Sequence, residues 1–437
     1  MHFWSIILSK TVSREFAVTA AFCIWPPSDR RDQAIRSAIG ETIDWNRVYR
    51  IVKRQRVAGL VHDGLTRTGV SVPSDFARQI RNLASDIARK NLQFAAESMR
   101  IQQMFDEAGV PVLFVKGTAL AQLVYGNLVQ KHSWDIDALV TPDDVPRALQ
   151  LLAGAGYHAF PPLPPMTDER YKHWIRFSRE YVLYHETKSV PVEIHWKLME
   201  NDYFLSGISA LSPSQMVAIS GGLGIRTLVE DDLFAYLCVH GATHGWSRLK
   251  WLADVAALMA DDSANDAKRR LETAQKANAE DCVAQAFLLC DRLFGTPSLK
   301  VLAQELRCSY RYRWLEHIAL GAMARENAET ELGQAPFYKV PIFISHFMLG
   351  RGWRFALNEF WIKVNGPYDL QHAKFPNWLG FLYPLVRVAS WIKRRGRMRP
   401  MPVPPKACTA KPVSTADQSE EKPDAATRIA SPTVMSG

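Results

Sequence analysis

The sequence predicts an α+β fold, with a small mixed-sheet core flanked by N- and C-terminal helical regions. Apolar residues recur at helical spacing from Asp44 to Phe105, and runs of strand length follow between residues 110 and 196. The helical period is then expected to return from Ser212. With 437 residues, 47% hydrophobic and 22% charged, the chain is long enough for several packed units and too apolar to be disordered.

Residues 1–105 form the predicted N-terminal helical region. Asp44 is a candidate N-cap, and Gly69 with Pro73 separates two of its helices. The short apolar run at 3–8 has no preceding basic residues and no clear cleavage site, so it makes a poor signal peptide.

Residues 106–200 form the predicted α/β core. Continuous β-branched or alternating apolar runs predict its strands, and the last two runs predict an antiparallel hairpin. Thr141 followed by Pro142 is typical of a helix start. The expected elements are a strand at 110–115, a helix at 117–125, a strand at 134–140, a helix from Thr141 to Gly154 or Gly156, a Pro-rich loop at 161–165, and strands at 181–184 and 190–196.

Three further regions complete the predicted organisation. Residues 201–335 are expected to form a helical domain, and residues 336–398 an aromatic-rich amphipathic region. The tail at 399–437 is dominated by Pro, Ser, Thr, Ala and charged residues, which predicts disorder.

The six cysteines are scattered and form no CxxC pair, so we expect reduced thiols and a cytoplasmic protein. The formal net charge is +9, but one acid-free stretch near the C-terminus contributes six of these charges. A nucleic-acid-binding protein would spread basic residues over a docking face, so a nucleic-acid partner is not expected. The six residues are Arg387, Lys393, Arg394, Arg395, Arg397 and Arg399.

Asp135 and Asp137 lie two residues apart on a predicted strand, so their side chains point to the same face. Two such carboxylates repel each other unless a cation lies between them, and carboxylate oxygens are good ligands for Mg²⁺. The pattern indicates a metal site suited to phosphoryl chemistry. By itself, an Asp-x-Asp pair also fits a solvated strand edge.

The order of several motifs resembles the polymerase-beta-like nucleotidyltransferase superfamily, and more closely an uncharacterised bacterial branch of it. The resemblance covers roughly residues 45–330. The matching segments are Val115-Lys-Gly-Thr-Ala-Leu120, Asp135-Ile-Asp-Ala-Leu-Val140, Val192-Glu-Ile-His-Trp196 and His240-Gly-Ala-Thr-His244, followed by Trp246, Arg248, Trp251 and Asp254.

The resemblance implies an enzyme that moves a nucleoside monophosphate from an NTP, with Mg²⁺, to an unknown small-molecule or protein acceptor. It implies Asp135, Asp137 and Glu193 as metal ligands and catalytic residues. It also implies nucleotide-binding roles for Lys116, Gly117, Thr118, Lys131, His240, His244 and Arg248.

Alternatives remain open for some of these residues. Glu193 also fits a solvent-facing strand residue, with Glu180 and Glu186 as other candidates for the third acid. Lys131 also fits a solvated loop lysine. The two histidines, four residues apart on a predicted helix, also fit a packed pair with Asp254 as a structural partner.

Residues 378–399 join an apolar, tryptophan-containing stretch to the basic cluster, which suits a helix on an anionic membrane surface. A helix packed on the protein is the favoured interpretation. For the whole chain, the alternative to an enzyme is a non-catalytic nucleotide-binding or scaffold protein that retains the fold.

Overall fold

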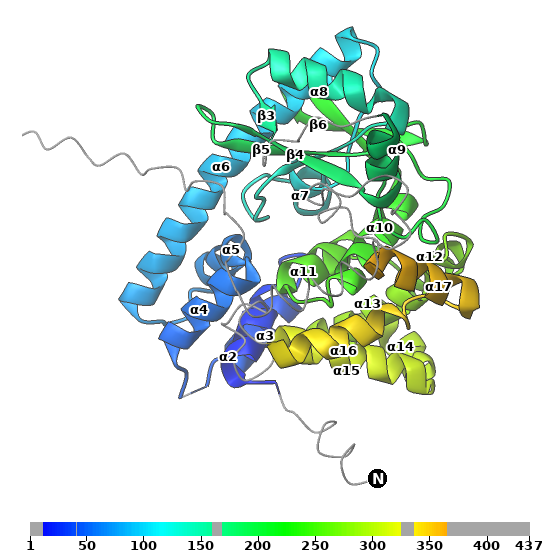
Figure 1. Ribbon diagram of the computed structural model, residues 1–437. Coiled ribbons are helices and arrows are strands. Elements are labelled where there is room, and N and C mark those ends of the chain that lie inside the picture. The colour runs from blue at the N-terminus through cyan, green and yellow to red at the C-terminus, as the bar shows by residue number, and fades with distance from the viewer. Residues whose placement is uncertain (1–11, 41, 160–167, 325–335, 365–437) are drawn as a thin grey trace, which may run out of the picture. The chain divides into compact units, whose positions relative to one another are not determined.

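The computed structural model describes residues 12–40, 42–159, 168–324 and 336–364, which all belong to one compact unit. A five-stranded mixed sheet lies among many helices, and this confirms the predicted α+β class (Figure 1).

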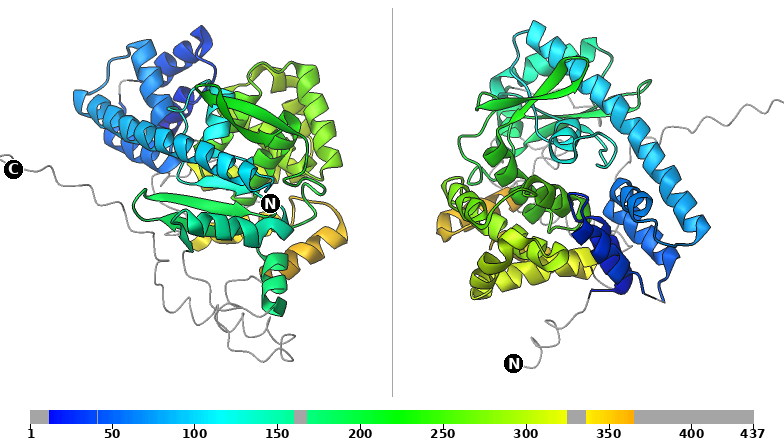
Figure 2. Two further views of the ribbon diagram at one scale, coloured as in Figure 1. Left: turned by 90° about the horizontal axis from the view of Figure 1, so that it is seen from above. Right: turned by 180° about the vertical axis from the view of Figure 1, so that it is seen from behind.

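The N-terminal region is helical, as expected. Asp44 accepts a hydrogen bond from the backbone N–H of Arg47, so it caps its helix, and Gly69 ends the following helix with a φ of +59°. The longest helix, α6, contacts α4 and α5 near its start and the sheet region further on (Figures 1 and 2). The helices are α2 (Arg14–Phe22), α3 (Asp29–Ala38), α4 (Trp45–Gln55), α5 (Ala58–Thr68) and α6 (Ser74–Glu107).

The central sheet has the strand order β1-β2-β5-β4-β3. Strands β2 and β5 are parallel, and the other neighbours are antiparallel. The strands are β1 (Leu113–Phe114), β2 (Ile136–Leu139), β3 (His158–Ala159), β4 (Glu180–His185) and β5 (Val190–His195). The connecting helices are α7 (Gly117–Tyr125), the short η1 (Pro142–Asp144), α8 (Val145–Gly154) and α9 (Asp168–Phe177).

Several predicted elements of the core are confirmed. The β4–β5 pair is the expected antiparallel hairpin, and the Thr141 hydroxyl accepts from the backbone N–H of Asp144 as an N-cap. Two predicted strands are shorter than expected, since β1 spans only 113–114 and β2 only 136–139. As a result Asp135 lies just before its strand rather than on it.

The expectation that the helical period returns at Ser212 is wrong for the first part of that region. Strands β6 (Ser214–Ser220) and β7 (Leu223–Leu228) form an antiparallel hairpin. Its turn contains Gly221 and Gly222, whose φ values of +58° and +78° favour glycine. Alternation along β7 buries Ile225 and Thr227, a period of two that favours a strand.

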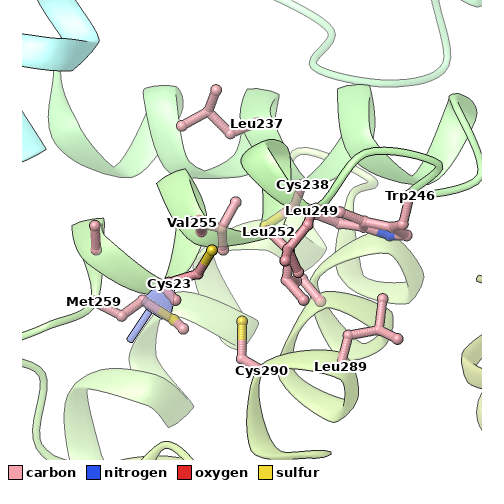
Figure 3. Packing of buried hydrophobic residues seen from close by; sticks show 14 of the residues in the cluster. Cys23, Leu237, Cys238, Trp246, Leu249, Leu252, Val255, Met259, Leu289 and Cys290 are labelled. Carbon is pink, nitrogen blue, oxygen red and sulfur yellow. The ribbon is translucent and has the colours of Figure 1, made fainter. Parts of the chain in front are cut away.

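Helices resume at Glu230. The described residues form two apolar cores: one lies among the helices, and the other surrounds the sheet. Figure 3 shows Trp246, Leu249 and Leu252 in the helical core. The helices are α10 (Glu230–Thr243), α11 (Leu249–Leu258), α12 (Ala264–Lys276), α13 (Glu280–Phe294), η2 (Pro297–Leu299), α14 (Lys300–Leu306), α15 (Tyr310–Ala324), α16 (Pro336–His346) and α17 (Gly352–Val364).

Several predictions concern residues outside the described ranges: the apolar run at 3–8, the Pro-rich loop at 161–165, the segment at 378–399 and the tail at 399–437. Among the described helices, none is both long and apolar enough to cross a membrane. The five described cysteines are free thiols.

Candidate active site

The turn between β1 and α7 forms one wall of the site. Lys116 has an extended backbone, and Gly117, the first residue of α7, has a φ of +57°. This left-handed conformation favours glycine. A Cβ on Gly117 would lie 3.5 Å from the carbonyl oxygen of Asp135. The start of α7, whose free N–H groups favour anions, therefore lies beside the segment that carries the acidic residues.

Two acidic side chains come from neighbouring parallel strands. Asp137 of β2 lies opposite Glu193 of β5 in the register of the sheet. Together with His195, these residues place ligand atoms that all lie within 4.8 Å of one another. Asp135 is outside this tight group, although it lines the same cleft as Asp137. The structure thus brings Asp137 and Glu193 together and places Asp135 beside them.

His195 lies at the centre of the acidic cluster. Its Nε2 is 3.2 Å from Oδ1 of Asp137 and 3.4 Å from Oε2 of Glu193, and its Nδ1 is 3.4 Å from Oε2 of Glu180. Burial lowers the pKa of His195, but the three carboxylates outweigh it and raise the pKa to about 9. In the metal-free protein, His195 is therefore protonated at neutral pH and compensates part of the acidic charge.

Lys116 is paired with Asp137. Its Nζ donates a hydrogen bond of 2.8 Å to Oδ1 of Asp137. Burial by itself would lower the pKa of Lys116, but the Asp137 charge raises it above its usual value. Burial would likewise raise the pKa of Asp137, but Lys116 and His195 hold it well below its usual range. Both partners contact Oδ1, and no described side chain bonds Oδ2.

Asp135 has a different environment. Burial, followed by the charges of Asp137 and Glu193, raises the pKa of Asp135 to about 7. No described side chain pairs with its carboxylate. A divalent cation would relieve this repulsion and would find oxygen ligands on all three acids. The chemistry of the donor set, including the unbonded Oδ2 of Asp137, therefore fits a metal ion.

A cleft opens beside these acids. Its walls come from the start of α7, the loop before β2, and helices α10 and α11. Helix α7 contacts both α11 and the sheet (Figure 1). Lys131 forms an ion pair in the cleft with Asp254, whose other oxygen accepts a 2.9 Å hydrogen bond from the Tyr125 hydroxyl. The lining residues are Lys116, Gly117, Leu120, Lys131, His132, Ser133, Asp135, Asp137, Leu237, His240, Lys250, Trp251 and Asp254.

The two histidines of α10 pack against Trp251. The ring centroids of His240 and His244 are 4.5 Å apart, and each lies about 5 Å from the Trp251 ring. Burial lowers the pKa of His240 well below its usual value, so His240 is neutral. His240 lines the cleft, and its Nδ1 is buried without a described partner. Asp254 pairs with Lys131 and Tyr125 rather than with the histidines.

Gly241, between these histidines, is explained by packing. A Cβ at this position would lie 2.4 Å from the ring of Trp246, which is fully buried. A larger side chain is therefore excluded here.

Three residues with expected nucleotide-binding roles do not line the cleft. Thr118 is buried within the first turn of α7, and the ring of His244 packs against the rings of Trp251 and His240. The guanidinium of Arg248 donates to the backbone carbonyl of Arg54, which ties the start of α11 to α4. The structure brings Lys116, Gly117, Lys131 and His240 to the cleft.

Sequence reasoning missed Lys250 and the central position of His195. Lys250 is the only basic residue of α11, whose sequence is LKWLADVAAL, and a lone lysine on an apolar helix was a usable signal. His195 shares a strand face with Glu193, but nothing in the sequence shows that it contacts Asp137, 58 residues away.

Comparison with known proteins identifies the family of the chain. No curated protein matches the chain. Residues 41–295, more than half of the sequence, match a family described as "Uncharacterised nucleotidyltransferase", and the matched region contains every acid and lysine of the cleft. The chain belongs to this family of uncharacterised nucleotidyltransferases.

Proposed function

We propose that the protein is a Mg²⁺-dependent nucleotidyltransferase that moves a nucleoside monophosphate from an NTP to a small-molecule or protein acceptor. The observation that carries the proposal is the register of β2 and β5, which sets Asp137 opposite Glu193 beside a cleft that also contains Asp135. The family match supports the same reaction class.

In the proposed reaction, an acceptor oxygen attacks the α-phosphorus, the bond from that phosphorus to the bridging oxygen breaks, and pyrophosphate leaves. Asp135, Asp137 and Glu193 would hold Mg²⁺, which supplies charge neutralisation for the phosphates when bound. Glu193 is 22% exposed and takes the proton from an acceptor hydroxyl. Gly117 and the start of α7 bind phosphate oxygens through backbone N–H groups.

The paired cations also have a role in this proposal. Lys116 and His195 both bond Oδ1 of Asp137 and so fix the orientation of its carboxylate. A fixed carboxylate presents Oδ2 in one direction, which pre-organises the site for a cation.

The experiment is a panel of the four NTPs, each labelled at the α-phosphate, with Mg²⁺ and with a cell extract as the source of acceptors. We expect label transfer and pyrophosphate release from one or more NTPs, and neither product with Asp137→Asn. Asp75→Asn is the matched control, because Asp75 is an exposed helix-surface residue. Absence of transfer and of pyrophosphate with every NTP would contradict the proposal.

The second candidate is a non-catalytic nucleotide-binding or scaffold protein that retains the fold. The observation that favours it is the set of ion pairs within the site, Lys116 with Asp137 and Lys131 with Asp254, which compensate acidic charge without a metal. Nucleotide binding without pyrophosphate release would favour this candidate.

A further inference from the structure

The basic residues of the cleft differ in how their charge is compensated. Lys116 pairs with Asp137 at 2.8 Å, and Lys131 pairs with Asp254, a carboxylate that also accepts from Tyr125. Each of these ammonium groups already has a buried counter-ion. A cation that is already paired attracts a bound phosphate less than an unpaired cation does.

Lys250 has no such partner. Its Nζ donates 3.1 Å to the backbone carbonyl of His132, and no described carboxylate lies within ion-pair distance. The charged groups that face it are Lys131 and Arg56, which repel it, and Asp135 and Asp254, which attract it. Burial and the neighbouring cations lower the pKa of Lys250 to about 7, and a phosphate bound beside it would raise that pKa and restore the charge. Lys250 is thus a cleft lysine without an ion pair.

His240 provides a second polar group without a partner. The residue is 6% exposed, its Nδ1 has no described hydrogen-bond partner, and it lines the same cleft as Lys250. A buried polar nitrogen without a partner destabilises the protein, so a ligand that forms a hydrogen bond with it gains affinity. The two groups come from different helices, α10 and α11, and both face the cleft.

Another part of the cleft lining also favours an anion. It is the Lys116–Gly117 turn at the start of α7, a helix of nine residues. Helix N-termini attract phosphate through their free N–H groups and the helix dipole. An anion in the cleft would therefore meet donors from α7 as well as from α10 and α11, in a cleft that the carboxylates of Asp135 and Asp137 also line.

We propose that Lys250 and His240 form the subsite that binds the β- and γ-phosphates of the nucleotide, with Lys250 as its principal cation. This inference rests on the proposed function and adds the residues that hold the polyphosphate. Lys250 compensates the charge of the departing pyrophosphate, and His240 donates one hydrogen bond from Nδ1. Lys116 and Lys131 instead orient the carboxylates with which they pair.

The test is isothermal titration of inorganic tripolyphosphate with Mg²⁺ into the full-length protein. Tripolyphosphate has no nucleoside, so its binding reports on this subsite without turnover. We expect Lys250→Met to weaken binding by about 10- to 100-fold, the effect of one charge-assisted hydrogen bond. Lys250→Arg should keep affinity within a few-fold of wild type, since it retains the charge.

Two further variants complete the test. Lys268→Met is the matched control, because Lys268 is exposed on α12, and it should bind like wild type. His240→Phe retains a buried ring without the nitrogen and should weaken binding less than Lys250→Met. Thermal melting separates misfolding from lost binding: Lys250→Met removes a charge that Lys131 and Arg56 repel, so its melting temperature should not fall.

Failure of this inference is distinguishable from failure of the proposed function. Equal tripolyphosphate affinity of Lys250→Met and Lys268→Met, or no binding by wild type, would overturn the inference while NTP transfer still supports the enzyme. Lys250-dependent tripolyphosphate binding with no transfer from any NTP would retain the subsite and contradict the enzyme.

Discussion

The two aspartates of the Asp-Ile-Asp motif should differ in how their replacement by asparagine changes the stability of the protein. From the sequence, two neighbouring carboxylates repel each other, so each substitution is expected to leave the melting temperature unchanged or slightly raised. The structure changes this expectation for Asp137, whose Oδ1 bonds both Lys116 and His195. Asp135 has no described ion-pair partner, so the expectation stands for that residue.

The magnitude follows from these contacts. Removing one partner of a buried ion pair costs about 3–5 kcal/mol, and a hydrogen bond to a charged group is worth about 1.5–3 kcal/mol. Asparagine keeps a neutral oxygen acceptor, so we expect Asp137→Asn to lose about 2–4 kcal/mol. An unfolding entropy of about 2.1 cal/mol/K per residue makes each kcal/mol worth only about 1.2 °C in a compact unit of this size, so the melting temperature falls by roughly 2–5 °C.

The assay is thermal unfolding in EDTA at pH 8. The pKa of Asp135 is about 7, so its carboxylate is ionised and repelled at pH 8, and Asp135→Asn should raise the melting temperature or leave it unchanged. Asp75→Asn, at an exposed ion pair, should change it little. Equal stability of Asp137→Asn and Asp135→Asn would refute this reasoning. Both should abolish NTP turnover, and wild-type turnover by either would refute the metal assignment.

Three other predictions concern ligands, pH and membranes. Mg²⁺ with an NTP should raise the melting temperature more than either alone, since ligands that bind only the folded state stabilise it; no shift with any NTP at millimolar concentration would contradict nucleotide binding. The carboxylate of Glu97 accepts hydrogen bonds from the Tyr157 hydroxyl at 2.6 Å and from Lys188 Nζ at 2.9 Å. Burial raises the pKa of Glu97, but its hydrogen-bonding partners outweigh burial and lower this pKa from 4.5 to about 2. The stabilisation that ionised Glu97 contributes is therefore complete above pH 4.5 and is lost as the pH falls towards 2. Glu97→Gln should lower the melting temperature at pH 7 and lower it much less near pH 2. An equal loss at both pH values would contradict this assignment. For 378–399, we expect neither the full chain nor a chain ending at Pro376 to co-sediment with anionic vesicles at low salt; salt-sensitive pelleting of the full chain alone would instead support the membrane interpretation.

Most local elements around the site could be predicted, because short-range rules govern them. Asp44 and Thr141 cap helices through their own side chains, and Gly117 permits a left-handed turn. The hairpin at 214–228 was missed, since its short alternating runs carry weak periodicity beside a long helical stretch. The predicted strands were also too long. A strand ends where the pairing with its neighbour ends, and the length of its own apolar run does not show that point.

The sequence by itself determined the order of the elements, the acidic pattern of Asp135, Asp137 and Glu193, and the family to which the chain is similar. These are properties of residue type and spacing. Only the tertiary structure decided which charges pair. Lys131 and Asp254 are 123 residues apart, and no periodicity connects them.

The same physical reason applies to the lysines of the cleft. The three lysines have the same side chain, so the sequence does not distinguish them. Because burial strengthens charge interactions, the distance to the nearest carboxylate determines whether each lysine forms an ion pair. Lys116 and Lys131 meet carboxylates and compensate them, whereas Lys250 meets the carbonyl of His132. Among the described residues that line the cleft, Lys250 is therefore the lysine without a carboxylate partner, and only the fold determines this.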